Sequence, residues 1–254
     1  MAVTFDAVGP AGGAGTNSST TPLTWTHVNG GNAILIGVTS FGGNTNQITG
    51  VTYGGVTIPL LGYIPSGNAS GGGIALYGLQ GATVPSGSNT VSAAFTGVND
   101  KIGGSVSYSG AGSLSAGTTN YGTSGNLVST AIVTHTGGIL VAAGCDGSSG
   151  TWGVTSGNLR WSDNASGGSA SDNAAGGDIA STGASQTITF TNSASDDWGI
   201  VAAEVIPPTG TNTSPAWATA YDTTAVAGTG TWTNPANAEG TGSSGGPWAT
   251  WTAP

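Results

Sequence analysis

Short runs of β-branched and aromatic residues recur along this chain between clusters of Gly, Asn and Ser, and no window shows sustained helical periodicity. Apolar side chains alternate within these runs. Val91, Ala93 and Phe95 share one face of a strand, and Ser and Thr occupy the other face. The pattern predicts an all-β fold, an antiparallel β-sandwich of the jelly-roll or lectin-like kind. The expected strands are residues 3–8, 23–27, 33–41, 48–53, 56–63, 74–79, 90–95, 104–108, 127–135, 139–144, 159–162, 186–191 and 199–206.

The composition distinguishes this chain from a disordered one of similar glycine content. Of its 254 residues 48 are Gly, yet 37% are hydrophobic and only 5% are charged. Disordered chains normally lack β-branched and aromatic residues and carry many charges. Residues 34–36 and 139–141 are apolar on both faces, as in the central strands of a sandwich. We therefore expect a packed core.

The charge balance argues against nucleic acid as a partner. The formal net charge is −9, and Lys101 and Arg160 are the only fixed cations, so no basic patch can neutralise a phosphate backbone. No segment approaches the length of a membrane span, and residues 1–6 show no basic stretch followed by an apolar run. We expect neither membrane insertion nor a Sec-type signal peptide. Cys145 is the only cysteine, and we expect a small buried residue there.

A change in composition divides the chain. Residues 206–208 (IPP) end the last expected strand, and a polar run follows. We expect a β-sandwich domain over residues 1–207 and a linker with an extended arm over residues 208–254. The second segment is too short and too rich in Gly and Pro for a substantial core. It is therefore either an arm that docks on a partner or a truncated second β module. Half of the eight tryptophans lie there: Trp217, Trp232, Trp248 and Trp251.

The two halves of the sandwich region share weak sequence similarity. Residues 26–35 resemble residues 134–140, and residues 88–92 resemble residues 185–189, at an offset of about 100 residues. Either an internal duplication or the low complexity of the sequence accounts for this similarity.

Three segments of the first half together resemble a known module. They are residues 48–60 (ITGVTYGGVTIPL), 74–79 (IALYGL) and 87–91 (GSNTV). The set resembles a β-sandwich module of bacteriophage tail and fibre proteins that also occurs in some bacterial surface proteins. Residues 231–238 (TWTNPANA) resemble the opening of a second module common in minor tail proteins. The resemblance implies a virion protein, made in the host cytoplasm and released in the particle. It carries no catalytic residues to this chain.

The carboxylates do not suggest an enzyme. A glycosidase needs two carboxylates that face one another across a groove. Glu204 and Glu239 are the only glutamates, and Asp196 and Asp197 are adjacent, so that their side chains diverge in an extended segment. Residues 242–246 (GSSGG) match a nucleophile-elbow pattern only through their composition, because no strand and helix flank them. We therefore expect no catalytic residues.

The remaining polar residues have structural explanations that we favour. His27 and His135 precede glycine turns at corresponding places in the two halves, which suits solvated strand ends better than a zinc site. Aspartates in loops can hold calcium, but they also stabilise turns with their own side chains, and we favour turns. No cofactor is therefore expected. The aspartates concerned are Asp146, Asp163, Asp172, Asp178, Asp196 and Asp197.

The tryptophans offer candidate contact surfaces. Trp152 and Trp161 flank a long loop region, and they are our candidates for stacking on a glycan. Trp25 and Trp198 fit a core, and the four tryptophans of the arm fit docking on a neighbouring subunit.

These expectations combine into a structural role in a phage virion, as a minor tail, fibre or capsid decoration protein. The expected partners are other virion proteins and further copies of this chain, with closed symmetry, and possible adhesion to a glycan of the host surface. Two rival hypotheses are a carbohydrate-binding module of a secreted bacterial protein and a polysaccharide-degrading enzyme.

Overall fold

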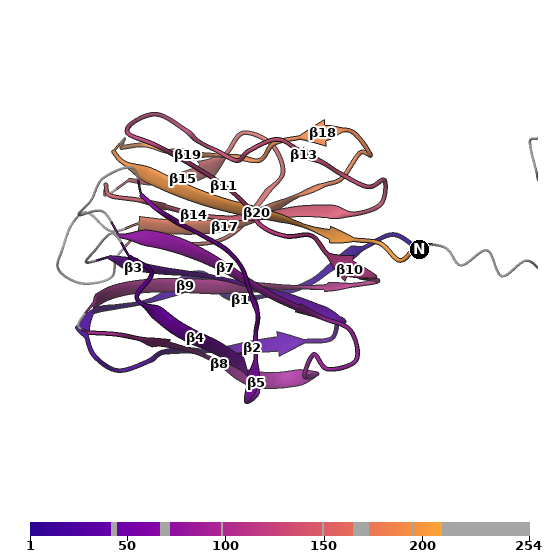
Figure 1. The fold of residues 1–254 in the computed structure, drawn as a ribbon, viewed down its shortest axis with the longest axis horizontal. Helices are drawn as coiled ribbons and strands as arrows, with labels where there is room; N and C mark the ends of the chain where they lie inside the picture. Colours follow the sequence, from indigo (N-terminus) through magenta and orange to yellow (C-terminus); the bar gives the residue numbers. More distant parts are fainter. Residues whose placement is uncertain are drawn as a thin grey trace, which may run out of the picture. The chain divides into compact units, whose positions relative to one another are not determined.

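The computed structural model describes residues 1–41, 45–66, 72–97, 99–148, 150–164, 173–194 and 196–209. Every regular element in these ranges is a β-strand, and the strands pair antiparallel (Figure 1). The predicted all-β, antiparallel fold is therefore confirmed. No helix among the described residues is long and apolar enough to cross a membrane.

Two inner sheets form the centre of the molecule. Inner sheet 1 has the order β1 (Thr4–Ser19), β9 (Asn99–Ser109), β3 (Ala33–Phe41), β7 (Gly73–Gln80) and β6 (Leu60–Pro65). Inner sheet 2 has the order β20 (Trp198–Ile206), β14 (Ile139–Asp146), β17 (Asn173–Ala180) and β16 (Asn158–Asn164), with β10 (Ser113–Leu114) and β11 (Thr118–Gly122) both beside β20.

Each inner sheet is covered by an outer sheet. Outer sheet 1 has the order β2 (Leu23–Asn29), β8 (Gly87–Phe95), β4 (Ile48–Tyr53) and β5 (Val56–Thr57). Outer sheet 2 has the order β12 (Leu127–Val128), β19 (Thr189–Asn192) and β15 (Trp152–Val154), and beside it lies the pair β13 (Ile132–Val133) and β18 (Ser185–Gln186).

The four layers enclose three hydrophobic cores. In β3, Ile34 and Ile36 face outer sheet 1, whereas Leu35 faces inner sheet 2. In β14, Leu140 faces outer sheet 2, whereas Val141 faces inner sheet 1. Strands that are buried on both faces read as continuous apolar runs, which explains the two runs in the sequence. The layers are therefore stacked as outer 1, inner 1, inner 2 and outer 2 (Figure 1).

The strand order repeats between the two halves. In inner sheet 1, Ala33 lies opposite Tyr108 and Gln80; in inner sheet 2, Ile139 lies opposite Val205 and Ala180. Strands β9, β3, β7 and β6 thus correspond to β20, β14, β17 and β16, and β1 corresponds to β10 with β11. The conserved order and pairing support the duplication over the low-complexity explanation.

The sequence predicted one sandwich for residues 1–207, whereas the structure builds two sandwiches packed back to back. Both belong to one compact unit, Met1–Gly210. The second unit, Thr211–Pro254, lies outside the described residues, as do the four tryptophans assigned to the arm.

Close packing of the two inner sheets depends on glycine and alanine. The indole of Trp161 lies between them, and a Cβ atom at Gly104 or Gly176 would come within 2.3 Å or 2.2 Å of that ring. A Cβ at Gly37 would meet the same indole at 2.7 Å. These three glycines form a slot for Trp161, so the high glycine content is partly a requirement of the interface between the halves.

Candidate functional site

One buried polar cluster lies between β1, β2 and β9 of the first half. Ser105 Oγ donates to the Gly9 carbonyl at 2.7 Å and accepts from Trp25 Nε1 at 2.9 Å. It also lies 3.0 Å from His27 Nδ1. Since the hydroxyl proton is already used, the network assigns the ring proton to Nδ1 and leaves Nε2 bare. That nitrogen is buried and has no hydrogen-bond partner among the described residues.

This cluster contains Ser, His and a nearby Asp but lacks the geometry of a catalytic triad. The Ser105 hydroxyl donates to a carbonyl and not to the imidazole, and both side chains are buried. Asp6 accepts from the Gly30 and Gly31 amides at 2.8 Å and 3.1 Å and from Ser107, and not from His27. In a triad the acid orients the base and the base takes the nucleophile's proton. Here each group instead holds a strand or a turn in place.

The same cluster predicts a dependence of stability on pH. Burial lowers the pKa of His27 to about 4 from its ordinary 6.5, and the charge of Asp6 opposes this only in part. The unfolded chain therefore takes up the proton first as the pH falls. Above pH 6.5 the contribution of neutral His27 to the free energy of unfolding is fully present. As the pH falls from 6.5 to 4, the free energy of unfolding decreases by about 2–3 kcal/mol. Urea unfolding across this pH range measures the loss.

The matched variant for this measurement is His27→Asn, whose side-chain amide keeps a donor near Nδ1 but does not titrate. Subtracting its pH profile from that of the wild type removes the contribution of the carboxylates, since these are present in both. We expect the difference in unfolding free energy to shrink as the pH falls from 7 to 4. A difference that stays constant would show that His27 is not held neutral.

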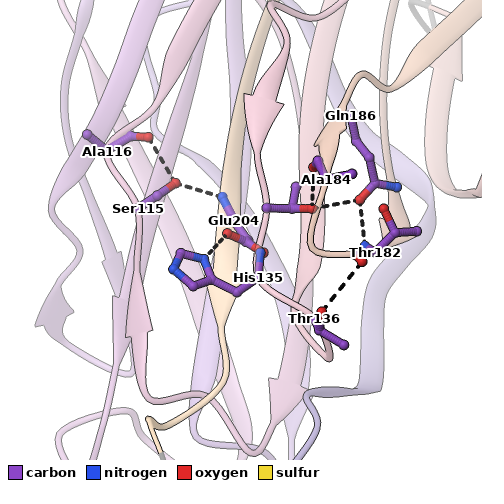
Figure 2. Close-up of polar contacts among 9 residues, drawn as sticks. Ser115, Ala116, His135, Thr136, Thr182, Ala184, Gln186 and Glu204 are labelled. Atoms are coloured by element: carbon purple, nitrogen blue, oxygen red, sulfur yellow. Dashed lines mark hydrogen bonds and ion pairs between the residues drawn. The ribbon is translucent and has the colours of Figure 1, made fainter.

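A second cluster joins Glu204 to the turn that precedes β14 (Figure 2). Glu204 is buried, and its Oε1 accepts from the His135 amide at 2.6 Å while Oε2 lies 2.8 Å from His135 Nδ1. The Glu204 amide donates to Ser115 Oγ, which in turn donates to the Ala116 carbonyl. Both carboxylate oxygens are therefore occupied by the protein's own donors. The imidazole of His135 is half exposed, in agreement with a solvated strand end.

The two halves use carboxylates for the same task. By strand register, Glu204 corresponds to Ser107. Glu204 precedes Val205, which pairs with the first residue of β14, and Ser107 precedes Tyr108, which pairs with the first residue of β3. In the first half Ser107 and the Gly30 and Gly31 amides share Asp6, and in the second half Glu204 binds the turn itself. A chain that turns from an outer to an inner sheet leaves amides that need acceptors. Glu204 is thus a structural residue in this fold.

A third cluster connects the two sandwiches. Asp178 on β17 accepts from Tyr108 on β9 at 2.8 Å, from Arg160 Nε on β16 at 2.7 Å and from Asn158 at 3.0 Å. The Arg160 guanidinium also lies 3.6 Å from the centre of the Phe5 ring on β1. Burial raises the pKa of Tyr108 well above its ordinary value, so its hydroxyl remains a donor. The cluster links both inner sheets.

A fourth cluster lies where β14 ends and β17 begins. Asp146 and Asn173 are opposite one another in register, and both are fully buried. Asp146 Oδ1 accepts from the amide and the hydroxyl of Ser148. Asp146 Oδ2 and Asn173 Oδ1 accept no hydrogen bond from any residue that the structure describes. Unlike the first three clusters, this one leaves two buried oxygen acceptors without donors.

The residues proposed for glycan contact occupy the cores. Trp152 and Trp161 are only 6% and 2% exposed, so neither presents a ring face to solvent. Trp161 fills the glycine slot between the inner sheets, and Trp152 packs edge-on against Phe190. This corrects the sequence-based assignment of both. Trp25, Trp198 and Cys145 are buried, as expected.

The polar residues that sequence reasoning missed are Asp6, Ser105, Ser107, Tyr108 and Asn173. The strand from Gly104 to Tyr108 did carry one signal, since Ser105 and Ser107 alternate with Val106 and Tyr108 and so had to face either solvent or a buried polar group. Among the described residues no three His, Cys, Asp or Glu side chains come together as a metal site. The predicted solvated strand end is found at His135 but is wrong for His27, which is buried, and each histidine belongs to a separate cluster.

Comparisons of this chain with known protein families, with curated proteins and with solved structures found no match.

Proposed function

We propose that this chain is a structural protein of a bacteriophage particle, a minor tail, fibre or capsid decoration protein that acts by assembly and display. The observation that carries the proposal is the set of hydrogen bonds that the buried polar groups form within the protein. In three of the four clusters the donors and acceptors, His27 Nε2 excepted, form hydrogen bonds that join strands or turns of the protein to one another. Such a molecule is built to hold a shape.

The surface chemistry supports contact with neutral or basic partners. Lys101 is buried, with its ammonium donating to the Ser19 and Thr21 carbonyls, and Arg160 is paired with Asp178. Neither of the two fixed cations is therefore available on the surface, while the net charge is −9. The solvent face of outer sheet 1 presents hydroxyl groups, as at Thr24, Thr26 and Thr90. Neither feature favours a phosphate backbone, so nucleic acid stays outside the proposed partners.

Immunogold electron microscopy tests the proposal directly. Antibodies against the recombinant chain are applied to particles released by lysis of source cells, and to the intact cells. We expect label at tails, fibres or capsid surfaces of the particles, with regular spacing if copies assemble symmetrically. Label confined to the cell envelope, together with saturable binding of the recombinant chain on a glycan array, would overturn the proposal in favour of a carbohydrate-binding surface protein.

A further inference from the structure

Two buried oxygen atoms at one end of the second sandwich lack donors. Asp146 is the last residue of β14 and Asn173 the first of β17, and the two are cross-strand neighbours. Both side chains are fully buried, and Asp146 Oδ2 and Asn173 Oδ1 have no partner among the described residues. Directly opposed residues on neighbouring strands point to the same side of a sheet. The two side chains thus lie side by side on one face of the sheet.

The surrounding hydrogen bonds fix which atoms face this site. The Asn173 amide nitrogen donates to the Ser148 carbonyl at 2.8 Å and to the Gly150 carbonyl at 3.0 Å. Its amide therefore cannot be flipped, and Oδ1 is the atom left over. Ser148 likewise donates twice to Asp146 Oδ1, so that Oδ2 is the atom left over. Two independently anchored side chains each present an unused acceptor.

Negative charge also gathers at this end of the sheet. The backbone of β14 continues past Asp146 to Gly147, whose amide donates to the Asp197 carbonyl at 3.0 Å. The Asp196 carboxylate lies within van der Waals contact of the position that a Gly147 Cβ would take. A buried carboxylate without a counter-charge is costly, so the site favours a positive ligand.

We propose that Asp146 Oδ2 and Asn173 Oδ1 bind a calcium ion. The two protein ligands are a carboxylate and an amide oxygen, with no nitrogen or sulfur donor, which suits a hard cation. Calcium accepts irregular coordination and completes its shell with water, whereas magnesium requires near-ideal octahedral geometry. With only two ligands fixed by the described residues, the expected dissociation constant is about 0.1–1 mM, the range of extracellular calcium modules. The ion would hold the end of β14 to the start of β17.

Two other species could satisfy the same oxygens. A proton on Asp146 would allow Oδ2 to donate to Asn173 Oδ1. A water molecule would donate to both oxygens. Neither species makes stability depend on calcium, so calcium dependence distinguishes the ion from both.

The first measurement is the thermal unfolding of the full chain at pH 7, once in a chelator and once in about 10 mM calcium. This concentration is roughly ten times the largest expected dissociation constant. Binding at this concentration should raise the melting temperature by about 3–5 °C. Equal magnesium should have a smaller effect. The shift should vanish in Asp146→Asn, which keeps the shape but removes the charge.

Asp163→Asn is the matched control for this variant. Asp163 lies on β16 near the same end, but it faces β1, where its Cβ would be 2.7 Å from a Cβ at Gly13. Removing its charge should leave the calcium shift unchanged. A shift lost equally in both variants would reveal general screening of acidic charge and would overturn the proposal.

Terbium luminescence provides a readout that does not rely on stability. Terbium replaces calcium in oxygen sites and emits when a nearby indole is excited. Trp198 is opposite Asp146 on β20, and Trp152 packs in the same core. We expect emission that calcium displaces and that Asp146→Asn abolishes. Absence of both the emission and the melting shift in the wild type would exclude calcium and leave a proton or water at the site.

Discussion

Replacing Asp178 with alanine is expected to lower the free energy of unfolding by about 3–5 kcal/mol. The substitution leaves the Arg160 guanidinium without its partner and the buried Tyr108 hydroxyl without its acceptor. It also removes the acceptor of Asn158. The large effect arises because an uncompensated charge and an unsatisfied buried donor cost more than the intact pair contributes. Urea unfolding of the full chain, monitored by tryptophan fluorescence, measures the change.

Two variants calibrate this result. Tyr108→Phe removes one hydrogen bond and leaves the Arg160–Asp178 pair intact, so we expect a loss of about 1 kcal/mol. Asp196→Ala removes an exposed carboxylate outside this cluster, and its effect should stay within about 0.5 kcal/mol in a calcium-free buffer. If Asp178→Ala cost no more than Tyr108→Phe, the cluster would not link the two sandwiches energetically.

Apolar alternation predicted strands such as β8 and β19, and continuous apolar runs predicted β3 and β14, whereas β10, β11, β15 and β17 were not expected. The alternating residues of β8 and β19 face the cores as expected, and the continuous runs in β3 and β14 are the centres of the inner sheets. The division into two sandwiches could not be predicted, because alternation shows that a face is buried but not which sheet covers it.

Strand β17 shows why part of the fold escaped sequence reasoning. Its sequence, NAAGGDIA, consists largely of Gly and Ala, which are depleted in strands. Residues 173–180 were therefore not expected to form a strand. The structure places small residues there because Trp161 and the facing sheet leave no room for larger ones. Long-range packing overrides intrinsic propensity at this strand.

The candidate site escaped for related reasons. Asp178 and Asn173 both lie on β17, so their cross-strand partners could not be inferred without that strand. Asp146 ends a strand that the pattern extended only to residue 144. No pattern in the sequence indicated that Gly37, Gly104 and Gly176, which are distant from Trp161 along the chain, would enclose its ring.

Replacing Gly176 with alanine is expected to cost more than about 3 kcal/mol, the upper end of ordinary overpacking. The added Cβ would lie 2.2 Å from Trp161 Nε1; β17 is held within inner sheet 2 by β14 and β16, and the indole is enclosed between the two inner sheets, so neither can move away easily. No positive φ is involved at Gly176, so steric overlap alone causes the loss. Urea unfolding measures it, with Gly50→Ala as the control. Gly50 is also a strand glycine without positive φ, but a Cβ there meets nothing within 4 Å, so that variant should be neutral or slightly stabilised.

A double-mutant cycle with Trp161→Ala separates overlap from any general intolerance of β17 to substitution. Trp161→Ala alone should cost about 3–5 kcal/mol through loss of a buried indole. In that background the atoms that clash with an alanine at 176 are absent, and the added methyl group fills part of the cavity. Gly176→Ala should then be close to neutral, so the two costs should be strongly non-additive. Additive costs would show that Gly176 is required for a reason other than the indole, and that the glycine slot does not account for the close approach of the two inner sheets.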